Sequence, residues 1–129
     1  GEAPPPETWV VRNRLKATKS GGKESKVRVV EEGGDEAETR FRVVEVLSRG
    51  LWIEASPVTG RTHQIRVHLA IGGRPILGDR HYGAPPDPAA PRVMLHASEL
   101  RLAHPVSRRL LTIRSPLPPD FLAALESLR

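Results

Sequence analysis

The sequence contains no cysteine, which excludes disulfide bonds as a source of stability. A chain without disulfides is not a disulfide-rich secreted scaffold, and we expect a protein of the reducing cytoplasm. No stretch approaches the roughly 18 consecutive apolar residues of a membrane-spanning helix, so we expect no membrane partner. Aromatic residues make up only 4% of the 129 residues, and aliphatic side chains must therefore build most of the core.

Positive charge is what the chain has in excess, with a formal net charge of +5 at pH 7. Such an excess fits a polyanionic partner, nucleic acid first and an acidic membrane surface second. An inert basic surface would produce the same count, so charge alone does not decide between them. The length is that of one domain.

The spacing of apolar residues predicts an α+β fold, in which an antiparallel-rich mixed sheet carries short helices. Strand-like patterns lie over Trp9–Leu15, Lys26–Val30, Thr39–Leu47, Leu51–Ser56 and Leu110–Ile113. We expect the third and fourth of these strands to form a hairpin through a three-residue turn, Ser48 to Gly50. Helical spacing predicts a last helix over Phe121–Leu128, with Pro119 in its first turn.

Proline and glycine predict the irregular segments. We expect residues 1–8 to be a loose Pro-rich lead, Ala17–Glu24 a loop, Glu31–Glu38 a solvated acidic loop, and His104-Pro105 a turn. Four prolines in nine residues exclude a regular element over residues 84–92. That loop either faces RNA or another partner, or is a tolerated surface insertion.

The stretch Thr59–Tyr82 is the candidate site, because a polar run there opens into an apolar one where a strand hands over to a helix. We expect Thr62 to be the N-cap of this helix and Gly72-Gly73 to end it. Arg61, Thr62, His63 and Arg66 could then converge on one phosphate or carboxylate. The alternative is a solvated helix start with ordinary surface arginines. A zinc site is not expected, because His63 and His68 are five apart and point to different helix faces.

Three blocks in order carry a family resemblance: GRTHQIRVHLA, GRPILGDRHYG and LHASELRLAHP, followed by a Pro-rich run that ends at Phe121. Together they resemble the C-terminal half of an RluA-type RNA pseudouridine synthase, from about Trp9 to Phe121. Residues 1–129 would accordingly be the C-terminal portion of a pseudouridine synthase catalytic domain. RNA, either ribosomal RNA or tRNA, is the partner that this resemblance implies.

The resemblance implies isomerisation of uridine without cofactor or metal. An aspartate attacks, the C–N glycosidic bond breaks, the base rotates, and it rejoins through carbon. A partly buried aspartate stays ionised only beside a positive charge, and the position within the motif assigns that role to Arg66. Arg61, Thr62, His63 and Gln64 would position the nucleotide or the RNA backbone. Leu95 matches an apolar position against the flipped base, although a place in the core would explain it equally well.

The nucleophile block of the family, HRLDxxTSG, is absent from this sequence, as is the tyrosine-bearing block. None of the four aspartates is a credible nucleophile, and we interpret Asp79 as a structural cap. We therefore expect a truncated domain that is inactive alone and supplies the arginine-bearing half of a site. A lone half would expose sheet edges, so a homodimer or a swapped assembly is possible.

Two other functions stay open at this point. One is a non-catalytic RNA-binding module derived from the same fold, and the other is a basic protein-interaction domain. A binding affinity that falls with salt would separate RNA binding from the latter. The sequence does not identify the RNA or the uridine.

Overall fold

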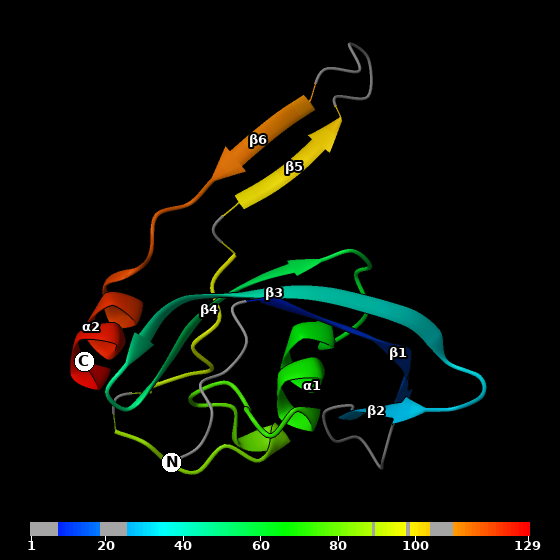
Figure 1. The fold of residues 1–129 in the computed structure, drawn as a ribbon, viewed down its shortest axis with the longest axis horizontal. Coiled ribbons are helices and arrows are strands. Elements are labelled where there is room, and N and C mark those ends of the chain that lie inside the picture. Colours follow the sequence, from blue (N-terminus) through cyan, green and yellow to red (C-terminus); the bar gives the residue numbers. More distant parts are fainter. Residues whose placement is uncertain (1–7, 19–25, 89, 98, 104–109) are drawn as a thin grey trace.

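Four antiparallel strands form the sheet on which most of the chain packs (Figure 1). The computed structural model describes residues 8–18, 26–88, 90–97, 99–103 and 110–129. The sheet has the order β2-β1-β3-β4, built from β1 (Thr8–Thr18), β2 (Lys26–Val30), β3 (Asp35–Leu47) and β4 (Gly50–Pro57). A separate two-stranded sheet pairs β5 (Glu99–Ala103) with β6 (Leu110–Arg114). The helices are α1 (Gln64–Ile71), the 3₁₀ turn η1 (Arg80–Tyr82) and α2 (Pro119–Leu128).

Helix α1 covers one face of the four-stranded sheet, while β5 and β6 extend away on the other side (Figure 1). Alternation along β3 turns Ala37, Thr39, Phe41 and Leu47 inward, as a period of two requires. Phe41 stacks on Trp9 of the neighbouring strand, with ring centroids 5.1 Å apart. The main core cluster comprises Phe41, Leu69, Ile76, Met94 and Ala124. The α+β prediction is thus confirmed, and it places α1 between the sheet and the turns that follow.

Strands β1 and β3 run several residues beyond their predicted ends, β1 along β2 as far as Thr18 and β3 along β1 from Asp35. Ala17 and Thr18 continue β1, and residues 35–38 belong to β3, so the predicted loops were wrong at these positions. Acidic side chains of β3 lie opposite arginines of β1: Arg12 forms an ion pair with Glu38, and Arg14 reaches Glu36 at 3.5 Å. Cross-strand pairs of opposite charge stabilise a ladder that the acidic composition alone did not predict.

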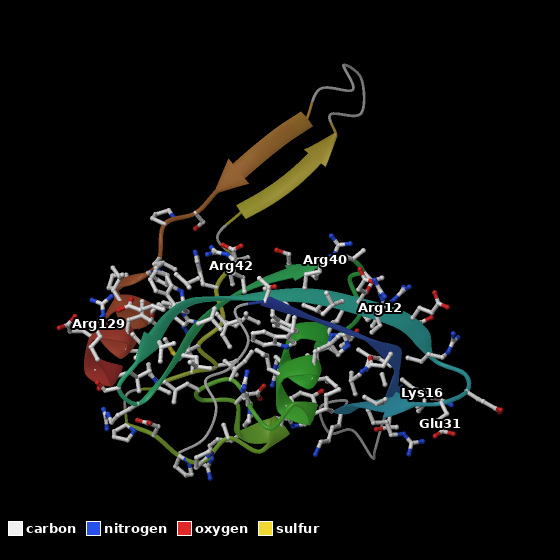
Figure 2. All side chains as sticks on the ribbon, viewed as in Figure 1. Arg12, Lys16, Glu31, Arg40, Arg42 and Arg129 are labelled. Carbon is white, nitrogen blue, oxygen red and sulfur yellow. The ribbon has the colours of Figure 1, made fainter. Side chains whose placement is uncertain are left out.

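Charged side chains dominate the outer face of the sheet, where Figure 2 shows Arg12, Arg40 and Arg42 opposite α1.

The hairpin between β3 and β4 is confirmed, but Leu47 pairs with Gly50, so its turn has two residues rather than three. Pro119 lies in the first turn of α2, as predicted. Residues 84–92 form no regular element where they are described, whereas residues 1–7 and His104-Pro105 lie outside the described residues. No helix among the described residues is long and apolar enough to cross a membrane.

A buried polar network fastens α1 to the sheet through His68, which is 1% exposed. Nε2 of His68 donates to Oδ1 of Asn13 on β1 at 2.8 Å, and Nδ1 accepts from the Thr39 hydroxyl on β3 at 2.7 Å. This arrangement needs a neutral imidazole with its proton on Nε2. Burial disfavours the charged ring and lowers the pKa of His68 below its usual value of 6.5.

We expect the free energy of unfolding to fall as the pH drops below about 6.5, because unfolded His68 then binds a proton that the native ring does not accept. The contribution of His68 to this fall is at most about 1.4 kcal/mol per pH unit. Urea unfolding between pH 5 and pH 8 measures it. His68→Gln should be less stable at pH 8 and show a shallower fall, whereas His96→Gln should keep the wild-type slope. Equal slopes for wild type and His68→Gln would contradict this assignment.

Candidate functional site

The entry into α1 is held by Gln64 rather than by Thr62. Thr62 was predicted to be the N-cap, but the N-cap residue is His63, which has left-handed dihedrals (φ 52°, ψ 21°) and no side-chain capping bond. Oε1 of Gln64 instead accepts from the Arg61 amide at 3.1 Å and from the Thr59 hydroxyl at 2.6 Å. The prediction of a Thr62 cap was therefore wrong, because the side chain inside the helix binds back to the loop before it.

The amide of Gln64 is fully engaged within the protein. Its Nε2 donates to the Glu38 carbonyl at 2.8 Å and to the Thr39 hydroxyl at 2.9 Å. Two donated and two accepted bonds use the whole capacity of a side-chain amide. Gln64 therefore fixes the loop of Thr59 and Arg61 against β3.

Arg66 and Asp79 form a bidentate ion pair across 13 residues of sequence. Nε of Arg66 lies 3.0 Å from Oδ2 of Asp79, and Nη2 lies 2.8 Å from Oδ1. The Asp79 side chain is 0% exposed and that of Arg66 is 17% exposed. Asp79 precedes η1 but makes no side-chain capping bond. Its interpretation as a structural cap was thus wrong, because its carboxylate binds the Arg66 guanidinium instead of the backbone amides of η1.

Tyr82 collects the other side chains around this pair. Its ring centroid is 5.1 Å from the guanidinium carbon of Arg66, a cation–π distance. The Tyr82 hydroxyl accepts from the Val27 amide at 2.9 Å and lies 2.7 Å from Nδ1 of His63. His63 and Arg66 were expected to share a helix face, and both of them contact Tyr82.

A cavity of about 350 Å³ opens beside this cluster. Its lining consists of Pro57, Thr59, Gly60, Arg61, His63, Gln64, Ile65, Arg66 and Leu95. The structure therefore brings five of the six predicted site residues to one cavity, and the sixth, Thr62, is exposed and outside its lining. Apolar walls with a few fixed cationic groups suit a planar ligand that carries a nearby negative charge.

Two arginines place the walls of this cavity. Nε of Arg61 donates to the Glu36 carbonyl at 2.9 Å, which draws this side chain toward β3. Arg92 donates to the carbonyls of Val93 and Leu95 at 2.9 and 3.3 Å and binds both oxygens of Asp120 on α2. The hydrogen bond from Arg92 lowers the pKa of Asp120, so this pair stays ionised and holds the Leu95 segment against α2.

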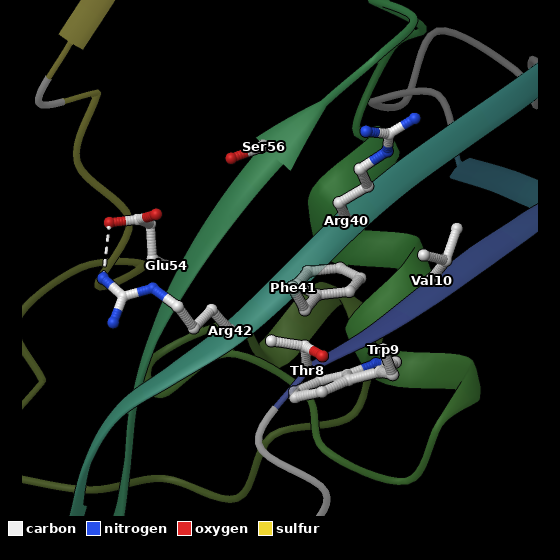
Figure 3. A pocket seen from close by; sticks show the side chains of 8 residues that line it. All are labelled: Thr8, Trp9, Val10, Arg40, Phe41, Arg42, Glu54 and Ser56. Carbon is white, nitrogen blue, oxygen red and sulfur yellow. Dashed lines mark hydrogen bonds and ion pairs between the residues drawn. The ribbon is translucent and has the colours of Figure 1, made fainter.

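A second hollow of about 420 Å³ lies on the outer face of the sheet (Figure 3). Arg42 and Glu54 bind each other there at 3.0 Å, as Figure 3 shows, and none of the predicted site residues lines it. Of its charged groups, Arg42 pairs with Glu54 across β3 and β4, and Arg40 pairs with Glu38 on the same strand. The cavity beside Arg66 is therefore the better candidate for a functional site.

Two residues that matter here were not predicted as site residues, Asp79 and Tyr82. Both lie in the block GRPILGDRHYG, which the resemblance had already brought forward. Their distance in sequence from Arg66 hid the contact, since only the turn at residues 76–79 brings them back to α1. Among the described residues, no group of three His, Asp or Glu gathers as the ligands of a metal would.

Comparison with known proteins gives a consistent family. A family model described as RNA pseudouridylate synthase matches residues 3–71. Ribosomal large subunit pseudouridine synthase D of Nitrosomonas europaea is 44% identical over 108 residues, which cover 78% of this chain and 31% of that protein. Dual-specificity RNA pseudouridine synthase RluA of Escherichia coli is 42% identical over 93 residues, covering 70% of this chain and 42% of that protein.

A solved structure supports the same fold. Human RNA pseudouridylate synthase domain containing 4 superposes with a TM-score of 0.67 at 25% identity, covering 95% of this chain and 56% of that one. The chain spans only part of the length of its relatives: the match covers 31% of the ribosomal enzyme from Nitrosomonas europaea. The family model, which covers just over half of the chain, and the relatives above 40% identity agree. The chain belongs to the RluA-type RNA pseudouridine synthase family.

Proposed function

We propose that this chain is the C-terminal portion of a catalytic domain that isomerises uridine to pseudouridine in RNA, and that it supplies the arginine-bearing half of the site. The observation that carries the proposal is the cavity lined by Arg61 and Arg66, whose lining contains no carboxylate. All four aspartates are described, and none of them lines the cavity. The nucleophile would then come from another part of the whole protein.

The chemistry of Arg66 supports this role. A nucleophilic aspartate beside a flipped base is partly desolvated, and only a cation close to it keeps it ionised at neutral pH. Arg66 lines the cavity, while Asp79 binds the Nε and Nη2 atoms of its guanidinium. In this proposal Arg61, Thr62 and His63 contact the nucleotide or the RNA backbone, Gln64 holds their loop, and Leu95 packs against the base.

Ribosomal RNA is the substrate that the names of the relatives favour, and tRNA is the second candidate. A modifier of either RNA would act in the cytoplasm. A non-catalytic RNA-binding module remains the alternative function, because the cationic cavity alone would also serve binding. Turnover separates the two proposals directly.

We expect the isolated chain to release no tritium from RNA that carries [5-³H]uridine, because it lacks a nucleophile at the cavity. The whole protein that contains this chain should release tritium, and Arg66→Ala in it should lower kcat/KM by about 100-fold or more, as for loss of one charge-stabilising group. Arg74→Ala is the matched control: Arg74 is exposed, follows the same helix and is outside the cavity. Turnover by the chain alone, or an Arg66→Ala variant as active as Arg74→Ala, would refute the proposal.

We further propose that the isolated chain self-associates through a sheet edge. Both outer edges of the β5–β6 sheet and the free edge of β4 have no strand partner among the described residues, and two-stranded sheets are marginal alone. Sedimentation velocity from micromolar to near-millimolar chain should show a rising average mass. A constant monomer mass over that range would exclude such an assembly.

A further inference from the structure

We propose that Asp79 is a positioning residue, which sets the orientation of the Arg66 guanidinium with Tyr82 as its second support. This inference rests on the proposed function, in which Arg66 holds the nucleophilic carboxylate. It gives the GDRHY segment a role in supporting Arg66, although no residue of this segment lines the cavity.

The contact geometry fixes one edge and one face of the guanidinium. Both oxygens of Asp79 bind the edge formed by Nε and Nη2, at 3.0 and 2.8 Å. Two parallel hydrogen bonds define the plane of the guanidinium group, which one bond would leave free to rotate. The ring of Tyr82 lies 5.1 Å from the guanidinium carbon and adds a contact from the aromatic side. Arg66, with a single flexible side chain, thereby becomes a rigid group at the cavity wall.

The two supports belong to one turn, which is itself tightly held. The Asp79 amide donates to the Ile76 carbonyl at 2.9 Å, and the Asp79 carbonyl accepts from the amides of Tyr82 and Ala84 at 3.2 and 3.0 Å. Gly78 before it has φ +86°, and a Cβ there would lie 2.0 Å from the Arg92 carbonyl oxygen. A glycine is therefore required for the close approach that brings Asp79 under α1.

Burial makes this arrangement costly unless it is complete. Asp79 is fully buried, and a buried carboxylate is tolerated when its charge is paired and its oxygens are hydrogen-bonded. An isolated cap or a surface ion pair would not need such burial. A catalytic guanidinium must be held in a fixed position, because a displacement of about 1 Å can cost about 100-fold in rate. A buried, fully hydrogen-bonded partner such as Asp79 supplies that position.

The test uses the whole protein with Asp79→Asn, a change that keeps the shape of the side chain but places an amide N–H₂ against the guanidinium. We expect kcat to fall about 10- to 100-fold with KM for RNA within about twofold, since the proposed function assigns Arg66 to the nucleophile and not to a phosphate. The acid limb of the kcat profile should move to higher pH, because a misplaced Arg66 no longer lowers the pKa of the nucleophile. Simple loss of a negative charge would move that limb the other way.

A kinetic double-mutant cycle separates this inference from the proposed function. If Asp79 acts through Arg66, then Asp79→Asn should cause no further loss of kcat in an Arg66→Ala background. Glu54→Gln, which breaks the exposed pair with Arg42 on the outer face, is the control and should keep kcat. If Asp79→Asn does not fold, Tyr82→Leu is used instead, with a smaller fall in kcat that is again absent in the Arg66→Ala background.

Each outcome decides one of the two claims. Full kcat in a folded Asp79→Asn variant, or independent losses in the Arg66→Ala background, would overturn the positioning role and leave the proposed function intact. Full activity of Arg66→Ala would overturn the proposed function, and this inference with it. A rise in KM alone would assign Asp79 to RNA binding and also contradict the positioning role.

Discussion

A buried ion pair between Arg66 and Asp79 is the interaction on which the site depends. It joins the helix after β4 to the residue that precedes η1, and Tyr82, the last residue of η1, contacts the guanidinium. Pairs of this kind contribute little net stability compared with an apolar contact, but loss of one partner leaves an uncompensated charge and costs about 3–5 kcal/mol. The pair therefore specifies one arrangement of α1 and the turn more than it adds stability. The His68 network sets the other side of the same helix by fastening it to β1 and β3.

Local signals predicted the fold well wherever one face of an element is buried. The alternation along Thr39–Leu47 and Leu51–Ser56 predicted the hairpin, and Pro119 predicted the start of α2, because these patterns follow from burial and backbone geometry alone. The length of β3 was underestimated for a different reason. Residues 35–38 read as a loop from composition, whereas opposite arginines on β1 keep them in the ladder, and this pairing is not visible in either segment by itself.

In the site, too, most residues close together in the sequence were predicted correctly to lie together, whereas contacts between residues far apart in the sequence were not predicted. The helix-start motif predicted that Arg61, Thr62, His63 and Arg66 could converge. The structure gathers Arg61, His63 and Arg66 around one cavity with Gln64 and Leu95, whereas Thr62 lies outside its lining. The role of each side chain was harder to predict. The resemblance assigned Gln64 to the nucleotide or the RNA backbone, and the structure adds internal hydrogen bonds of its amide to Thr59, Arg61, Glu38 and Thr39. Asp79 was taken for a cap, because 13 residues separate it from Arg66 and only the folded turn reveals the contact.

The central claim is that Arg66 and Asp79 act as one unit, and a thermodynamic double-mutant cycle on this chain tests it most directly. Urea unfolding of wild type, Arg66→Gln, Asp79→Asn and the double variant yields the coupling free energy between the two side chains. The account predicts a coupling of about 2 kcal/mol or more, with the double variant more stable than the two single losses would add up to. Additive losses, with a coupling below about 0.5 kcal/mol, would contradict it.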